Sequence, residues 1–296
     1  MKSISCLLLG LTALVAMNAS AQANPQEPFP VKRISLSTGV TLEYVEQGDK
    51  DGVPVILLHG FPDSWRSYEH VIPHFPKTFH VFAISQRGHG NSDKPATGYF
   101  PKDFAADIAA FIRALKLPPA VLVGHSMGAT ITMQFAISYP MLTRNIVLEG
   151  TMISFDDKPD LVEYKKFVDE LKDPIDTSVI REFQSGTVAH PISENFFNTI
   201  VSESMKAKAH VWKGVWQGLM TANYRAALYS LKTPALVLWG EKDAFGPLSD
   251  QEHILDAVPG SVILKYKDTG HSLHWEQPER FAKDITFFVE SLKEKK

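Results

Sequence analysis

The sequence predicts an α/β fold in which a mostly parallel eight-stranded sheet is flanked by helices and carries a helical cap insertion. Short apolar runs rich in β-branched residues alternate along the chain with segments whose apolar residues recur at helical spacing. One run, residues 53–58 (VPVILL), is apolar throughout, which is typical of a parallel strand buried on both faces. Between residues 151 and 231 no such run occurs, and helical segments rich in aromatic residues replace it.

The individual elements follow from local patterns. Residues 31–38 and 41–47 alternate apolar and polar side chains on either side of Gly39, which predicts a half-exposed hairpin. The remaining strands are predicted at residues 53–58, 81–84, 121–123, 146–148, 235–239 and 262–266. Helices are predicted at residues 104–115, 129–139, 249–258 and 278–292. Because strands and helices alternate, helices should cover both faces of the sheet.

The predicted domain organisation is a core interrupted by a cap. Residues 24–150 and 232–296 form the core, because they contain all the predicted strands. Residues 151–231 interrupt the alternation of strands and helices. We therefore expect this middle block to be a helical cap over the carboxyl edge of the sheet.

Residues 1–23 have the features of a signal peptide. Lys2 is followed by an apolar run at residues 7–17 that is too short to span a bilayer, and small residues then alternate up to Ala23. We therefore expect a secreted or periplasmic protein with a cleaved signal peptide. Cys6 is the single cysteine and lies inside this segment, so the mature chain should have no disulfide and no cysteine metal ligand.

The composition argues against several classes of partner and cofactor. The 296 residues are 44% hydrophobic and 21% charged with a formal net charge of −3, and no cluster of Lys and Arg indicates a nucleic-acid partner. No later apolar run is long enough for a membrane helix. His70 and His74 lack the glutamate of a zinc-binding H-E-x-x-H helix and have Pro73 between them, so we expect no metal and no other cofactor. The sequence leaves the oligomeric state open.

The segment from Gly124 to Gly128 matches the motif G-x-S-x-G, with Ser126 at its centre. It follows the predicted strand at 121–123 and begins the predicted helix at 129–139, which is the context that this motif requires. A sharp turn between strand and helix would lift the serine clear of the sheet and surround it with amides of the helix N-terminus. Ser126 is therefore the predicted nucleophile.

A serine hydroxyl needs a base to remove its proton, and His271 is the best candidate. It lies in the loop after the last predicted strand, in the segment DTGHS. His274, three residues further on, is a weaker alternative. His59 and His125 adjoin the active loops, but each lies beside backbone that must turn tightly, so we interpret them as packing or supporting residues.

The imidazole in turn needs an acceptor that fixes its tautomer. Asp243 follows the predicted strand at 235–239, and the resulting chain order of serine, aspartate and histidine is the one expected for a nucleophile elbow of this kind. Glu149 ends the predicted strand at 146–148 and is a rival for the same role. We favour Asp243 because of its position in the loop.

The reaction also needs an oxyanion hole made of backbone N–H groups. The residue after the nucleophile, Met127, supplies the first donor. The loop His59-Gly60-Phe61-Pro62 follows a buried strand, and Phe61 is the predicted second donor because Pro62 has no N–H group.

The chain resembles the α/β-hydrolase superfamily over residues 33–292. The motifs that carry the resemblance are HGFPDSW (59–65), QRGHGNSDKP (86–95), GHSMGA (124–129), WGEKD (239–243) and TGHSLHWEQPERF (269–281). Their occurrence in the right order makes the match specific for the superfamily. The resemblance implies the α/β-hydrolase fold.

The nucleophile separates this chain from the families that it otherwise resembles. HGFPDSW and the cap region are similar to epoxide hydrolases and haloalkane dehalogenases, which have an aspartate nucleophile where this chain has Ser126. An alkyl-enzyme ester requires a carboxylate, so a serine implies an acyl-enzyme and ester, lactone, thioester or amide substrates. Gln86 replaces the aspartate of the usual D-x-R-G-x-G-x-S motif, and we expect this to affect loop geometry alone. The HGGG loop of many lipases is missing, which disfavours long-chain lipids.

The leading hypothesis is a serine hydrolase that cleaves carboxylic esters of small to medium substrates. A lactonase of the enol-lactone or acyl-homoserine-lactone type and a C–C bond hydrolase use the same three residues and stay open. A hydrolase-like ligand-binding receptor is the alternative outside the enzymes, and the complete set of Ser126, Asp243 and His271 argues against it. Turnover of p-nitrophenyl acetate and labelling by a fluorophosphonate probe would separate enzyme from receptor.

Overall fold

A sheet of eight strands, in the order β1-β2-β4-β3-β5-β6-β7-β8, forms the centre of the computed structural model, which describes residues 29–291. The strands are β1 (Lys32–Ser35), β2 (Thr41–Gly48), β3 (Val53–Leu58), β4 (Phe79–Ser85), β5 (Ala120–His125), β6 (Thr143–Glu149), β7 (Ala235–Gly240) and β8 (Val262–Tyr266). β2 pairs antiparallel with β1 and β4, and the other neighbours pair parallel. The predicted mostly parallel sheet is confirmed. The predicted signal peptide lies outside the described residues and stays a prediction.

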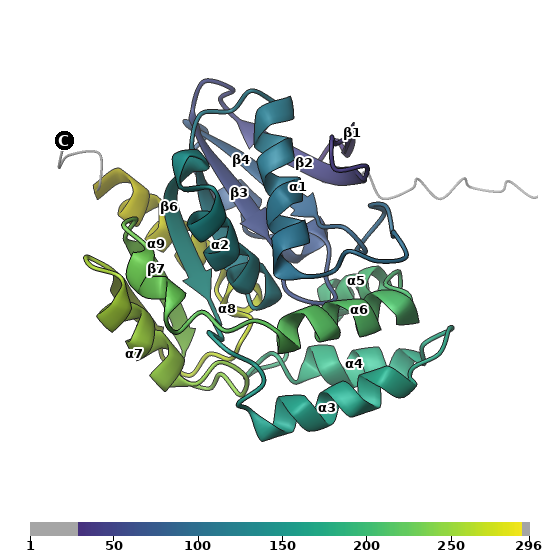
Figure 1. The fold of residues 1–296 in the computed structure, drawn as a ribbon. Helices are drawn as coiled ribbons and strands as arrows, with labels where there is room; N and C mark the ends of the chain where they lie inside the picture. The colour runs from purple at the N-terminus through teal and green to yellow at the C-terminus, as the bar shows by residue number, and fades with distance from the viewer. Residues whose placement is uncertain (1–28, 292–296) are drawn as a thin grey trace, which may run out of the picture.

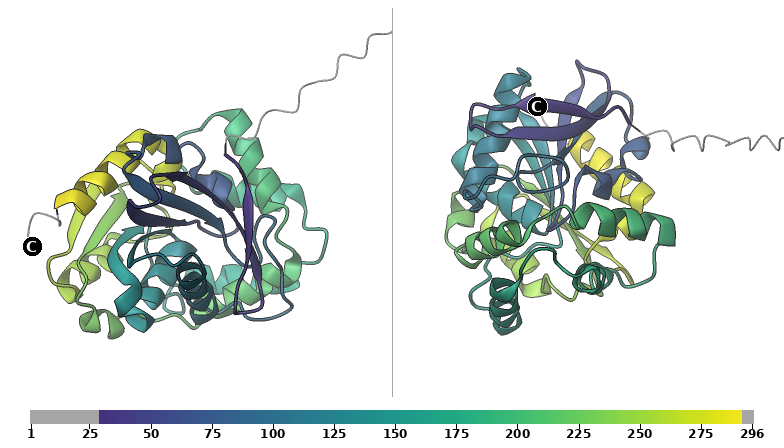
Figure 2. Two further views of the ribbon diagram at one scale, coloured as in Figure 1. Left: turned by 90° about the horizontal axis from the view of Figure 1, so that it is seen from above. Right: turned by 90° about the vertical axis from the view of Figure 1, so that its right-hand side faces the viewer.

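Helices cover both faces of this sheet (Figures 1 and 2). The helices of the core are α1 (Pro101–Ala114), α2 (Met127–Ser138), α7 (Leu248–Ala257), α8 (Leu273–Glu276) and α9 (Pro278–Ser291), and the short 3-10 helices are η1 (Trp65–Tyr68), η2 (Ile72–His74), η3 (Pro140–Leu142) and η4 (Ala227–Ser230). Side chains alternate along each strand, so Ile56 and Leu58 of β3 join the apolar cluster of α1 and α2. Val55 and Leu57 point to the other face and join the cluster of α9.

Four α-helices lie between β6 and β7 in the chain: α3 (Pro159–Glu170), α4 (Thr177–Ser185), α5 (Glu194–Ser204) and α6 (Ala209–Met220). Figure 1 shows them beyond the end of the sheet to which β6 points, at the carboxyl ends of the parallel strands. Each has a buried side toward the rest of the molecule; in α6 this side includes Trp212, Val215 and Trp216. These helices therefore cover the edge of the sheet where loops after parallel strands meet.

The structure differs from the predicted elements mainly at their ends. β4 begins at Phe79, two residues before the predicted start, and β6 begins at Thr143, three residues before it. In β4 the polar residue His80 pairs with Gly48 on one side and Pro54 on the other. Ladder pairing uses the backbone, so a strand continues past the point where its apolar pattern stops. No helix among the described residues is long and apolar enough to cross a bilayer.

Candidate active site

Ser126 lies at the turn between β5 and α2, as the motif predicts. Its backbone has φ 52° and ψ −113°, a positive-φ conformation outside the left-handed helical region that is strained for a residue with a side chain. The helix begins directly at the next residue and packs tightly on the end of β3. A Cβ atom on Gly128 would lie 2.0 Å from the carbonyl oxygen of Leu58, so only glycine allows this approach. The sequence thus holds the serine on a strained turn above the sheet.

His271 and Asp243 meet at the same edge of the sheet. The Nδ1 atom of His271 lies 2.9 Å from Oδ1 of Asp243, and both side chains are buried. Burial alone would lower the pKa of His271, but the charge and the hydrogen bond of Asp243 raise it above the ordinary value of 6.5. The carboxylate therefore favours the imidazolium form, which is the form that a general base must reach during catalysis.

The loops around this pair hold both partners in place. Oδ1 of Asp243 also accepts hydrogen bonds from the backbone N–H groups of Phe245 and Gly246, at 2.8 and 2.9 Å. Gly150 has φ 56°, and a Cβ atom there would lie 2.8 Å from Nδ1 of His271. A glycine at this position thus leaves room for the imidazole against the end of β6.

Phe61 and Met127, the predicted oxyanion donors, border the same cavity as Ser126. Met127 is the first residue of α2, where N–H groups have no partner within the helix. Neither N–H group donates a hydrogen bond to another of the described residues. Both are therefore available to a charged oxygen near Ser126.

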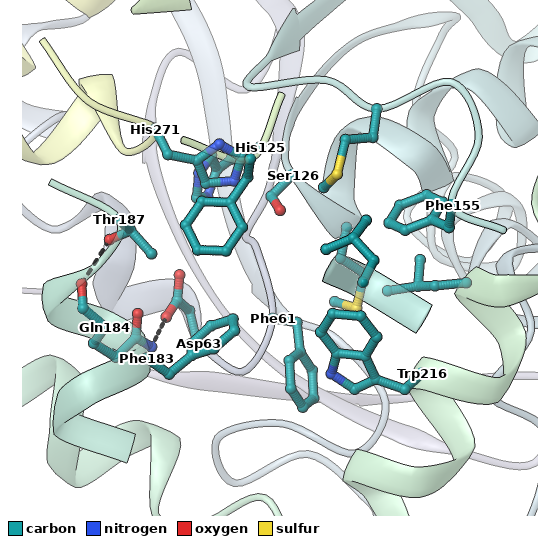
Figure 3. A pocket seen from close by; sticks show the side chains of 15 residues that line it. Phe61, Asp63, His125, Ser126, Phe155, Phe183, Gln184, Thr187, Trp216 and His271 are labelled. Carbon is teal, nitrogen blue, oxygen red and sulfur yellow. Dashed lines mark hydrogen bonds between the residues drawn. The ribbon is translucent and has the colours of Figure 1, made fainter. Parts of the chain in front are cut away.

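The cavity has a polar side and an apolar side. Figure 3 shows the Ser126 hydroxyl directed into it below His271, with Asp63 and Gln184 on one side and Phe155 and Trp216 on the other. The other apolar side chains around it are Phe61, Met127, Met152, Leu161, Phe183, Leu219 and Phe245. Its lining is suited to a mostly apolar group with a polar group near the serine, and its free volume in this structure is about 30 Å³.

The two rival residues form a separate pair. Nδ1 of His274 lies 2.7 Å from Oε1 of Glu149, which also accepts the backbone N–H of His274 at 3.1 Å. Nε2 of His274 lies 2.8 Å from Oγ of Ser67. Both side chains are fully buried, and neither borders the cavity of Ser126. The structure thus brings Asp243, and not Glu149, to His271, while the catalytic role of these residues stays a prediction.

His59 and His125 are buried, as their predicted packing roles require. Burial lowers the pKa of both histidines well below the ordinary value, so both rings are neutral. The ring of His125 lies between those of His271 and His274, with centroid distances of 4.8 and 4.7 Å. His125 also borders the cavity, which its position in the motif alone does not indicate.

Asp63 and Gln184 are cavity residues that the sequence analysis missed. Oδ1 of Asp63 accepts a hydrogen bond from Nε2 of Gln184 at 2.7 Å, and Oδ2 accepts one from Ser67 at 3.2 Å. Burial raises the pKa of Asp63 to about 6. An acidic residue directly after the predicted oxyanion loop was a usable signal for Asp63. Gln184 belongs to α4, and no local pattern marks it.

The loop that contains Gln86 has a structural role. Nε2 of Gln86 donates to the carbonyl of His59 at 2.9 Å, and the backbone N–H of Gln86 donates to Nε2 of His59 at 3.0 Å. The next residue, Arg87, forms a two-bond ion pair with Asp107 of α1, both distances being 2.6 Å. The hydrogen bonds of Gln86 thus fix His59 in the loop of the predicted oxyanion donor Phe61, and the ion pair of Arg87 fixes the Gln86 loop to α1.

Metal-binding donor types gather at one place in the described residues. The donor atoms of His125, Glu149 and His274 lie within 4.8 Å of one another, and all three residues are buried. Both ring nitrogens of His274 and one oxygen of Glu149 already take part in hydrogen bonds. Half of the atoms of this cluster that could bind a metal ion are therefore already used in hydrogen bonds within the protein.

Comparison with known proteins agrees with the observed fold. A family model described as the alpha/beta hydrolase fold matches residues 53–278. The AB hydrolase superfamily protein YisY of Bacillus subtilis is 27% identical, over 81% of this chain and 92% of its own. The structure of the esterase EaEST of Exiguobacterium antarcticum is similar with a TM-score of 0.78 and 22% identity, over 88% of this chain and 99% of its own. Est816, described as an N-acyl homoserine lactone degrading enzyme, has a TM-score of 0.73 and 26% identity, over 87% of this chain and 100% of its own.

Proposed function

Since the chain belongs to the alpha/beta hydrolase fold family, we propose that it is a serine hydrolase that cleaves carboxylic esters of small to medium size through an acyl-enzyme. The observation that carries the proposal is the pair of His271 and Asp243 at the cavity that also contains Ser126. A strained serine, a histidine whose pKa is raised by a carboxylate and two free backbone N–H groups are the parts that acyl transfer requires.

In the first step, Nε2 of His271 takes the proton of the Ser126 hydroxyl while its oxygen attacks the ester carbonyl. Asp243 holds Nδ1 and stabilises the imidazolium that forms. The carbonyl oxygen gains negative charge and accepts hydrogen bonds from the N–H groups of Phe61 and Met127. The imidazolium then gives its proton to the leaving alcohol, and the acyl group stays on Ser126.

In the second step, His271 takes a proton from water, whose oxygen attacks the carbonyl carbon of the acyl-enzyme. The oxyanion of this second step accepts hydrogen bonds from the same two N–H groups. The imidazolium then returns this proton to Oγ of Ser126 as the bond to the acyl group breaks and the acid leaves. The enclosed and largely apolar cavity favours acyl groups of limited size. Its polar side, with Asp63 and Gln184, favours a substrate with a hydrogen-bonding group close to the ester.

Replacement of the nucleophile tests the proposal. We expect Ser126→Ala to lower kcat for p-nitrophenyl acetate by about 10⁶-fold while the far-UV circular dichroism stays unchanged. A fluorophosphonate probe should label the wild type and not the variant. Wild-type turnover in Ser126→Ala, or labelling at another residue, would rule out the assignment.

A lactonase is the second candidate, because Est816 is 26% identical over nearly the whole of both chains and is described as a lactone-degrading enzyme. A lactone uses the same steps, except that its alcohol stays tethered to the acyl group. Parallel kcat/KM values for an acyl-homoserine lactone and an acyclic ester with the same acyl chain separate the two candidates. A ratio above ten in favour of the lactone would replace the ester proposal.

A further inference from the structure

A second hollow, of about 540 Å³, lies between helices α3, α4 and α6 and the loop that follows β7, next to the cavity of Ser126. We call it the aromatic groove, because five of its eleven lining residues are aromatic. These are Tyr164, Phe167, Phe183, Trp216 and Phe245. They come from α3, α4, α6 and the loop that follows β7. The mechanism above makes no use of this groove.

The aromatic groove reaches the predicted base through an unbroken series of ring contacts. The ring centroid of Phe167, a residue that is 44% exposed, lies 5.6 Å from that of Tyr164. The ring centroid of Tyr164 lies 5.9 Å from that of Phe183. The ring centroids of Phe183 and Phe245 lie 6.1 Å apart, and those of Phe245 and His271 lie 4.9 Å apart. Phe183, Phe245 and Trp216 border both the groove and the cavity of Ser126. The groove and the cavity of Ser126 are therefore adjacent, and these three side chains form their shared wall.

The groove carries negative charge and no positive charge on its wall. Its ionisable residues other than Tyr164 are Asp160 and Glu182, and no Lys, Arg or His borders it. Neither carboxylate takes part in an ion pair between described residues. By contrast, Lys158 lies 2.9 Å from Asp250, and Lys165 lies 2.6 Å from Asp169. The lysines of this neighbourhood thus neutralise other carboxylates.

We propose that the aromatic groove binds an alkylammonium group, such as trimethylammonium, at the alcohol end of the ester substrate. The inference rests on the proposed ester hydrolysis and names its substrate class. The faces of Trp, Tyr and Phe rings attract such weakly hydrated cations, and the two carboxylates add charge complementarity. A neutral apolar group would fit the rings but would reduce the hydration of the carboxylates, and an anionic group would be repelled by them.

Matched pairs of esters test this inference. The charged series consists of acetate esters of trimethylammonio-alkanols with two to six carbons between nitrogen and ester oxygen. In the neutral series a tert-butyl group replaces the trimethylammonium group, so that shape is kept and charge is removed. We expect the charged ester to have a kcat/KM at least about fivefold above its neutral partner at the best length, mainly through KM. A neutral ester that is equal or better at every length would overturn the inference.

Variants locate the effect in the groove. The double variant Asp160→Asn/Glu182→Gln should bring the ratio of charged to neutral kcat/KM toward one, and Phe167→Leu should lower it in part. The matched control is Glu163→Gln, because Glu163 is an exposed carboxylate of the same helix that pairs with Lys166 outside the groove. This control should leave the ratio unchanged. An unchanged ratio in the double variant would also overturn the inference.

Hydrolysis of p-nitrophenyl acetate and labelling of Ser126 report on the proposed function without involving the groove. If both fail, ester hydrolysis is wrong, and calorimetric titration with hexyltrimethylammonium then tests the groove alone. Binding that is lost in the double variant would support the cation site. Absence of binding, or equal binding to wild type and double variant, would contradict it.

Discussion

Two histidine–carboxylate pairs lie side by side in this molecule, and they differ in what they can reach. His271, which pairs with Asp243, borders the cavity of Ser126. The pair of His274 and Glu149 is fully buried and does not border this cavity, and we call it the sealed pair. The neutral ring of His125 stands between the two imidazoles.

The difference lies in the second nitrogen of each imidazole. Nε2 of His274 lies 2.8 Å from Oγ of Ser67, so both of its nitrogens are engaged within the protein. His271 borders the cavity, and its Nδ1 is the nitrogen that Asp243 holds. The Nδ1–carboxylate distance is short in both pairs, so it does not distinguish them. Of the two histidines, only His271 borders the cavity of Ser126, and this access to substrate makes it the candidate base.

The largest expected effect separates the two histidines. We expect His271→Ala to lower kcat for p-nitrophenyl acetate by about 10⁵- to 10⁶-fold, because Ser126 loses its base. His274→Ala should leave kcat of the folded protein within about tenfold of the wild type and should lower Tm instead. Steady-state kinetics and thermal unfolding monitored by circular dichroism check both. A 10⁴-fold loss of kcat in well-folded His274→Ala would make the sealed pair catalytic.

Substitution of Asp243 should likewise lower kcat more than substitution of Glu149. Asp243→Asn is expected to lower kcat by about 10⁴-fold, because an amide can hold the imidazole in the wrong tautomer. Glu149→Gln should lower it less than tenfold, because the amide oxygen can still accept both N–H groups of His274. Parallel kcat measurements on the two variants provide the check. Equal losses would show that Glu149 acts as a second acid of the reaction.

Truncation of Glu149 should reveal what the sealed pair contributes. Glu149→Ala leaves a buried histidine without its partner, so we expect the free energy of unfolding to fall by about 3–5 kcal/mol. Urea unfolding followed by tryptophan fluorescence measures this loss. Glu149→Gln serves as the control and should lose much less. A loss below about 1 kcal/mol in Glu149→Ala would deny the pair a structural role.

The smallest effect concerns pH. The raised pKa of His271 places the acid limb of kcat/KM above pH 6.5, since protonated His271 cannot accept the serine proton. The charges of Glu149 and Asp63 contribute to that rise in pKa, so Glu149→Gln and Asp63→Asn should each move the acid limb of kcat/KM to lower pH. Profiles of kcat/KM against pH test the shift, and a limb that stays in place in both variants would contradict it.

The same pKa shift affects folding stability. By linkage, the stability from the pair of His271 and Asp243 is fully present below pH 6.5 and is lost as pH rises through the raised pKa of His271.

Much of the fold was predictable because it depends on local patterns. The run at 53–58 locates β3, since this strand is buried on both faces. The pattern at 41–47 locates β2, but the prediction of a half-exposed strand was wrong there, because residues 42–45 are all buried between β1 and β4. The ends of β4 and β6 were wrong by two and three residues, because backbone pairing continues through polar residues such as His80.

The nucleophile turn was also a local property. The motif around Ser126 requires small residues at fixed offsets, and the structure has the strained backbone there that such a turn implies. Asp63 and Gln184 escaped prediction because their burial depends on how α4 packs over the core.

By itself the sequence determined the order of strands and helices and the strained turn at Ser126, since both depend on residues close together in the chain. Only the tertiary structure decided which carboxylate meets which histidine. Glu149 ends β6 and Asp243 follows β7, so both reach the same edge of the sheet, and sequence position could rank them but could not pair them. Glu149 meets His274 across 125 positions, and the walls of the aromatic groove come from separate helices. Such contacts depend on the packing of whole elements, which no local pattern encodes.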